Sequence, residues 1–164
     1  MLQASNMGGY TLKHILKSPF SAKILPYLLL GFTLLGFLDA AYLTIQHYQH
    51  VIPPCTTGGC ETVLTSSFAT IAGTPIALIG AGFYVFIAIL TGLYLQTKNK
   101  QIAMSLLVLC TAGLFAAVML IYIQAAVLHA FCYYCLFSEL IDFLLFDAAW
   151  WLWNTKNAEL TTEE

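Results

Sequence analysis

Charged residues are scarce in this chain. Only 9% of its 164 residues are charged, whereas 60% are hydrophobic. A soluble domain usually carries about 25% charged residues, because its surface has to face water. We therefore expect lipid to surround most of this surface, which makes the chain an integral membrane protein.

Arginine is absent, and the lysines form no basic block. Proteins that bind nucleic acids need such a block to neutralise phosphates, and the net charge here is −2. We therefore expect no nucleic-acid partner.

The sequence contains long apolar runs. A helix needs about 20 apolar residues to cross a bilayer. Four runs approach that length: Ile24–Gln46, Pro75–Gln96, Ile102–Gln124 and Cys132–Trp153. They predict an all-α membrane protein, a bundle of four transmembrane helices.

The apolar runs also divide the chain into parts. A polar segment (residues 1–23) precedes a membrane domain (residues 24–153), and a short tail (residues 154–164) follows it. The second run has a marked beginning, because Thr74 can cap a helix and Pro75 suits the first helical position.

The lysines predict which helix ends share a side of the membrane. They precede the first run, join the second to the third, or follow the fourth: Lys13, Lys17, Lys23, Lys98, Lys100 and Lys156. Four spans place all of them on one side, and the opposite side (about residues 47–74 and 125–131) has no lysine. Because cytoplasmic loops attract basic residues, we expect both termini in the cytoplasm. In a bacterial inner membrane the opposite side faces the periplasm.

Cys132 and Cys135 form a C-x-x-C at the start of the fourth run, on the lysine-free side. A helix N-terminus favours the thiolate, and residues at i and i+3 share a face, so the sulfurs can close a ring. The alternatives are a structural disulfide or half of a metal site. A metal site would need two more ligands from Cys55, Cys60 or His129. We favour redox chemistry and expect no metal.

Cys55 and Cys60 form a second pair in the long loop on the same side, made flexible by two glycines. Cross-linking so short a loop stabilises little, whereas exposed disulfides exchange readily. The alternative is a clip that only tidies the loop. We expect the following stretch, Glu61–Phe68, to form a short helix at the membrane surface.

Two cysteine pairs on one side can form a relay, because thiol–disulfide exchange passes electrons from pair to pair. A relay within lipid can end in a small hydrophobic carrier, a quinone. This pattern predicts an oxidoreductase that acts on thiols with a quinone as acceptor.

Acidic residues extend the cysteine stripe into the membrane. Glu139 and Asp142 follow Cys132 and Cys135 at i+7 and i+10, and acids within a span usually face the bundle or a wet cavity. One hypothesis is that Glu139 hydrogen-bonds or protonates a quinone carbonyl. The alternative is an acid satisfied by a polar group of a neighbouring helix.

Other residues carry weaker expectations. Asp39 in the first run would bond Thr44 or another helix. We expect His129 to be an ordinary loop histidine, with the stabilisation of a thiolate as the alternative. We expect His47 and His50 to be solvated and Cys110 to be an inert core thiol.

Several motifs together resemble the vitamin K epoxide reductase family. They are CETVLTSSFAT at Cys60–Thr70, the Gly73–Pro75 turn, LDAAYLT at Leu38–Thr44 in the first run, and Cys132–Cys135. The resemblance covers about residues 26–150. It implies a four-helix bundle around a quinone, capped on the outer side by the loop that bears the first cysteine pair.

The resemblance also implies a role for each cysteine. Cys135 is the thiol next to the quinone, and Cys132 is its resolving partner. Cys60 exchanges with Cys132, while Cys55 meets the external thiol protein.

Ser66 matches a serine near the active cysteines of the family, and Phe68 matches an aromatic residue of the pocket cap. With Glu139 they are our substrate-binding candidates. The chain departs from animal members in its short Cys55–Cys60 spacing and in having Glu139 where they carry a tyrosine. It also has no fused thioredoxin-like domain, so we expect the reductant to be a separate thioredoxin-fold protein.

Bacterial members of the family oxidise a periplasmic thioredoxin-fold partner, which supports disulfide formation, and reduce a membrane quinone. The resemblance implies this role here, with ubiquinone, menaquinone or phylloquinone as acceptor. Three alternatives stay open: a quinone or epoxide reductase whose product is the reduced quinone, a non-enzymatic four-span scaffold with structural disulfides, and a metal carrier.

Overall fold

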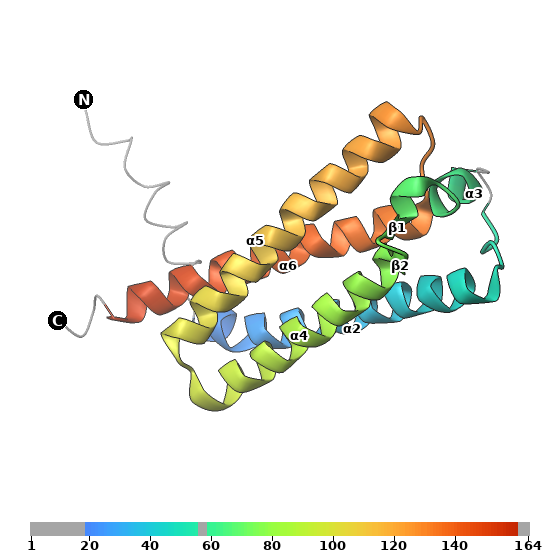
Figure 1. Ribbon diagram of the computed structural model, residues 1–164. Helices are drawn as coiled ribbons and strands as arrows, with labels where there is room; N and C mark the ends of the chain where they lie inside the picture. The colour runs from blue at the N-terminus through green and yellow to red at the C-terminus, as the bar shows by residue number, and fades with distance from the viewer. Residues whose placement is uncertain (1–18, 56–58, 161–164) are drawn as a thin grey trace, which may run out of the picture.

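Four long helices dominate the computed structural model, which describes residues 19–55 and 59–160 (Figure 1). They are α2 (Pro19–Gln49), α4 (Ile76–Thr97), α5 (Lys100–Tyr122) and α6 (Tyr133–Leu160). Each of the four predicted runs coincides with one of them. Lys13 and Lys17, which the topology prediction uses, lie outside the described residues.

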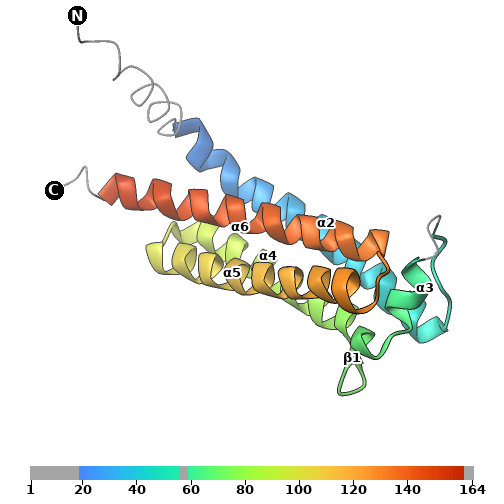
Figure 2. The ribbon, with the colours of Figure 1, turned by 90° about the horizontal axis from the view of Figure 1, so that it is seen from above.

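The long helices pack as a bundle, in which α2 lies along α4 and α6, and α5 lies along α6 (Figures 1 and 2). The start of α2, the α4–α5 link and the end of α6 meet at one end of the bundle. Four short elements gather at the other end: α3 (Gly59–Leu64), η1 (Ser67–Ala69), β1 (Thr70–Ile71) and β2 (Thr74–Pro75). This division into two ends agrees with the lysine pattern.

Three helical segments of the described chain are long and apolar enough to cross a membrane: Lys23–Gln49, Ile76–Thr97 and Lys100–Val127. Their outward faces are apolar, with Leu34 59% and Phe115 69% exposed. Helix α6 is not among them, although it has 28 residues, because Glu139, Asp142 and Asp147 lie close together in it.

Glycine allows two pairs of helices to approach closely. A β-carbon at Gly36 of α2 would overlap the ring of Tyr84 of α4, and one at Gly113 of α5 would overlap the ring of Phe83. Small residues at helix contacts are typical of membrane bundles, where packing replaces the hydrophobic effect as the force between helices.

The start of α4 differs from the prediction. Thr74 and Pro75 form β2, which pairs with Thr70 and Ile71 of β1, and α4 begins at Ile76. Thr74 is therefore not a helix cap, because strand pairing holds it in an extended conformation. Pro75 takes the N-cap position and makes no side-chain cap.

The predicted helix over Glu61–Phe68 is divided into α3 and η1. The hydroxyl of Thr65 donates to the carbonyl oxygen of Glu61, and that of Ser66 donates to the carbonyl oxygen of Val63, each at 2.7 Å. Such local side-chain bonds compete with the backbone bonds that would continue a helix.

Candidate functional site

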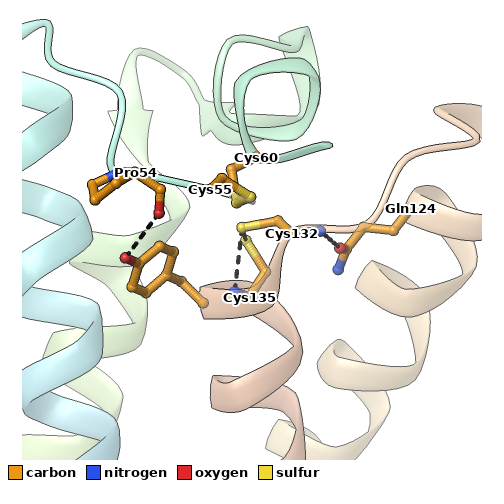
Figure 3. The surroundings of a disulfide bond; sticks show 7 residues. Pro54, Cys55, Cys60, Gln124, Cys132 and Cys135 are labelled. Carbon is orange, nitrogen blue, oxygen red and sulfur yellow. Dashed lines mark hydrogen bonds between the residues drawn. A yellow bond between two sulfur atoms is a disulfide. The ribbon is translucent and has the colours of Figure 1, made fainter. Parts of the chain in front are cut away.

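The loop cysteines Cys55 and Cys60 are joined by a disulfide bond. Cys60 lies in α3 and is completely buried, whereas Cys55 is half-buried. The disulfide lies beside the start of α6 and faces the sulfur of Cys132 (Figure 3). The structure thus brings together the two pairs that the sequence analysis joined in a relay.

Gly59 allows α3 to lie close to the chain just before α6. A β-carbon at Gly59 would overlap the backbone carbonyl oxygen of Phe131, the residue before Cys132. Only glycine permits this approach of two backbones. This glycine, expected to make the loop flexible, instead begins α3 and makes a close contact.

Cys132 occupies the N-cap of α6. Its carbonyl oxygen accepts from the N–H of Leu136 at 2.9 Å, and its sulfur accepts from the N–H of Cys135 at 3.4 Å. The thiol of Cys135 donates to the same sulfur, with the two sulfur atoms 2.7 Å apart. The exposed N–H groups and the dipole of the helix favour negative charge at this position. The pair therefore has the contacts that closing a disulfide requires.

A buried glutamine connects Cys132 to Glu139. The N–H of Cys132 donates to Oε1 of Gln124 at 2.9 Å, and Nε2 of Gln124 donates to Oε1 of Glu139 at 2.7 Å. Gln124 lies in η2 (Ile123–Val127), a short π-helical segment that follows α5, and it is 2% exposed. Such π-helical turns often occur at functional sites.

A cavity of about 150 Å³ lies within the bundle, with Cys135 in its wall. Helix α6 gives it four polar or reactive side chains: Cys135, Ser138, Glu139 and Asp142. The other helices and the segment from α3 to β2 (residues 59–75) make most of the remaining wall apolar. An apolar cavity of roughly this volume holds a benzene molecule, so a single ring fits here.

Two carboxyl oxygens in the cavity wall are without a partner in the described part of the chain. They are Oε2 of Glu139 and Oδ1 of Asp142, and both are buried. Buried polar atoms usually have a hydrogen-bond partner, so two unpartnered oxygens on residues that line one cavity point to a bound ligand or proton transfer. In the same described part, no three histidine, cysteine or acidic residues lie close enough to hold a metal ion.

The model of the vitamin K epoxide reductase family matches residues 27–150. The chain belongs to this family. Membership indicates quinone-linked disulfide oxidoreductase chemistry. No curated protein matches the chain.

The substrate-binding candidates of this family member all line the cavity. Ser66 and Phe68 line it from the segment between α3 and β1, and Glu139 lines it from α6. Cys135 also lies in the wall, whereas Cys132 does not. Gln124 donates to one oxygen of Glu139, a contact of the kind that the alternative hypothesis for this acid expected. A hydrogen bond from Glu139 to a quinone stays a prediction.

Asp39, Cys110 and His129, which the sequence analysis also considered, lie outside the cavity wall. Asp39 accepts from the hydroxyl of Ser138 at 2.6 Å, so it bonds another helix rather than Thr44. Cys110 is buried in the core. His129 is exposed, and its Nδ1 lies 2.9 Å from the carbonyl oxygen of Ala125.

Sequence reasoning did not assign four polar residues of the cavity wall to the site: His47, Tyr84, Gln124 and Ser138. The hydroxyl of Tyr84 donates to the carbonyl oxygen of Ser138 at 3.2 Å and also interacts with Asp142. His47, expected to be solvated, is half-buried in the wall. One feature of the sequence could have indicated Gln124: an amide near the end of an apolar run has to find hydrogen-bond partners inside the bundle.

Proposed function

We propose that the chain is a quinone-coupled thiol–disulfide oxidoreductase. It oxidises a separate thioredoxin-fold thiol protein on the periplasmic side and reduces a quinone in the membrane. One observation carries the proposal: Cys132 faces the loop disulfide, while its partner Cys135 lies in the cavity wall. The C-x-x-C therefore connects a redox pair accessible from outside to a ring-sized space in the bundle.

Electrons enter at the loop pair. A thiolate of the partner protein attacks the half-buried sulfur of Cys55 and breaks the Cys55–Cys60 bond, and its second thiol resolves the mixed disulfide. The partner leaves as a disulfide, and both loop cysteines become thiols. Two electrons and two protons have moved from the partner protein to the loop pair.

The loop pair then reduces the helix pair. Cys60 attacks Cys132 when Cys132 and Cys135 form a disulfide, and Cys55 resolves the new bond. The structure has the loop pair oxidised and the helix pair as thiols, which corresponds to the stage after this transfer.

The helix pair finally reduces the quinone. Two thiols and one quinone become one disulfide and one hydroquinone, so the two electrons and two protons balance. The ring is held among the apolar wall, with Ser66 and Phe68 covering it from the outer side. Glu139 lies one turn along α6 from Cys135 in the cavity wall. Its Oε2, which has no partner among the described residues, hydrogen-bonds a quinone carbonyl in this proposal.

We also propose that α6 is the fourth membrane span, with both chain termini cytoplasmic. Two of its acids, Glu139 and Asp142, line the internal cavity, and acids that face the interior of a bundle cost less than acids that face lipid. The α4–α5 link with Lys98 and Lys100 then lies in the cytoplasm.

Anaerobic mixing of the purified protein, a reduced thioredoxin-fold protein and a ubiquinone or menaquinone analogue tests the proposal by quinone absorbance. Quinone reduction should need Cys135 with any thiol donor. It should need Cys55 when the donor is the protein. Absence of quinone reduction with every thiol donor, with the loop disulfide intact throughout, would leave a structural scaffold as the better account.

A further inference from the structure

Gln124 hydrogen-bonds at both ends of its side-chain amide. Its oxygen accepts from the backbone N–H of Cys132, and its nitrogen donates to Oε1 of Glu139. At 2% exposure it is among the most buried polar residues of the described chain. Its partners belong to the start and the second turn of α6, so one amide connects the redox cysteine to the acid.

The chemistry of the partners fixes the direction of this amide. A backbone N–H can only donate, so Cys132 has to face the oxygen of Gln124. The NH₂ group then has to face Glu139, and Oε1 of that acid has to be an acceptor. When Glu139 is protonated, its proton therefore belongs on the other oxygen, Oε2.

Oε2 is the atom that has no partner in the part of the chain the structure describes. It is buried, and Glu139 lines the cavity. We infer that Gln124 is a positioning residue, which holds the proton of Glu139 on Oε2, the unpartnered oxygen of this cavity-lining acid, so that it is donated to a quinone carbonyl. This inference rests on the proposed function and assigns a residue that acts through Glu139.

The transfer balances within the proposed reaction. The quinone oxygen takes a proton from Oε2 as two electrons leave the Cys132–Cys135 pair. The carboxylate recovers a proton from the thiols, which release two protons as their disulfide closes. The second of these protons completes the hydroquinone.

A double-mutant cycle tests the inference with the full-length, pre-reduced protein and a short-chain ubiquinone analogue. Gln124→Met has a similar size but makes neither hydrogen bond, and Glu139→Gln has no proton to donate. We expect Gln124→Met to slow single-turnover quinone reduction about tenfold, since general acid catalysis contributes roughly 10²–10⁴-fold and is only partly lost. In the Glu139→Gln background the same change should have little further effect.

Two outcomes would overturn the inference. One is a wild-type rate in Gln124→Met. The other is a loss of the same size in both backgrounds, because Gln124 would then act by supporting the Cys132 backbone and not through Glu139. If the methionine variant does not fold, Gln124→Asn makes the same test with an amide one methylene too short to reach both partners.

Infrared spectroscopy gives a readout that does not depend on quinone reduction. The carboxylic C=O stretch that disappears in Glu139→Gln should move to higher wavenumber in Gln124→Met, because Oε1 loses its donor. An unmoved band would contradict the positioning role. If the wild-type protein reduces no quinone but the band moves, the proposed function fails while the Gln124–Glu139 contact stands.

Discussion

Gly59 lies so close to the carbonyl oxygen of Phe131 that no side chain fits between the two backbones. The contact joins the first residue of α3 to the residue that precedes Cys132. It therefore sets how near Cys60, the next residue in α3, comes to the helix pair.

Gly59→Ala should slow electron transfer from the loop pair to the helix pair. The added methyl group must push α3 away from Phe131, and a displacement of about 1 Å at reacting atoms can cost on the order of 100-fold in rate. We expect quinone reduction with a protein dithiol to fall at least tenfold. Stopped-flow absorbance of the quinone measures it.

Gly82→Ala is the matched control for Gly59→Ala, because a β-carbon at Gly82 meets nothing within 4 Å. Its rate should equal that of the wild type. Equal rates for both alanine variants would show that the close contact does not govern the transfer.

Glu139→Gln should lower quinone reduction about tenfold or more, since the amide keeps the bond to Gln124 but supplies no proton. Asp147→Asn is the control, because Asp147 lies exposed on the same helix and is not part of the cavity wall. The steady-state rate with excess reductant measures both. A similar loss in both variants would point to the charge of α6 rather than to the cavity.

Much of the fold could be predicted, because the length of an apolar run is a local property of the sequence. The four predicted runs coincide with α2, α4, α5 and α6 to within a few residues at most ends. The sequence also predicts that Cys132 lies at the start of a helix, because it is the first residue of the fourth apolar run.

The contacts between segments could not be predicted. Gln124 is 8 residues from Cys132 and 15 from Glu139, and only the packing of α5 against α6 brings the three together. Gly59 next to Cys60 resembles ordinary loop glycine, because its partner Phe131 is far away in the chain. Thr74 has the residue type of a helix cap, but strand pairing decides its conformation.

Gly36→Ala should destabilise the bundle, because the β-carbon would overlap the ring of Tyr84. Overpacking of this kind costs about 1–3 kcal/mol. Gly31→Ala, on the same helix, meets nothing within 4 Å and should leave the stability unchanged or slightly higher. Thermal unfolding of the detergent-solubilised protein compares the two, and equal midpoints would contradict the close packing of α2 on α4.

A Cys55→Ser/Cys135→Ser double variant should form a disulfide between Cys60 and Cys132 on mild oxidation, because the loop disulfide faces the sulfur of Cys132. Mass spectrometry of proteolytic fragments identifies the bond. The complementary variant Cys60→Ser/Cys132→Ser, which leaves Cys55 and Cys135, should cross-link much less. The reverse preference would show that the relay runs through the other two sulfurs.

A single-turnover measurement tests the central claim most directly. The protein is fully reduced, freed of reductant and mixed anaerobically with excess quinone analogue, and the hydroquinone formed per protein is counted. Two thiol pairs should yield two equivalents in the wild type, one in a Cys55→Ser/Cys60→Ser variant and none in Cys135→Ser. Hydroquinone formation that does not depend on Cys135 would contradict a relay that ends at the cavity.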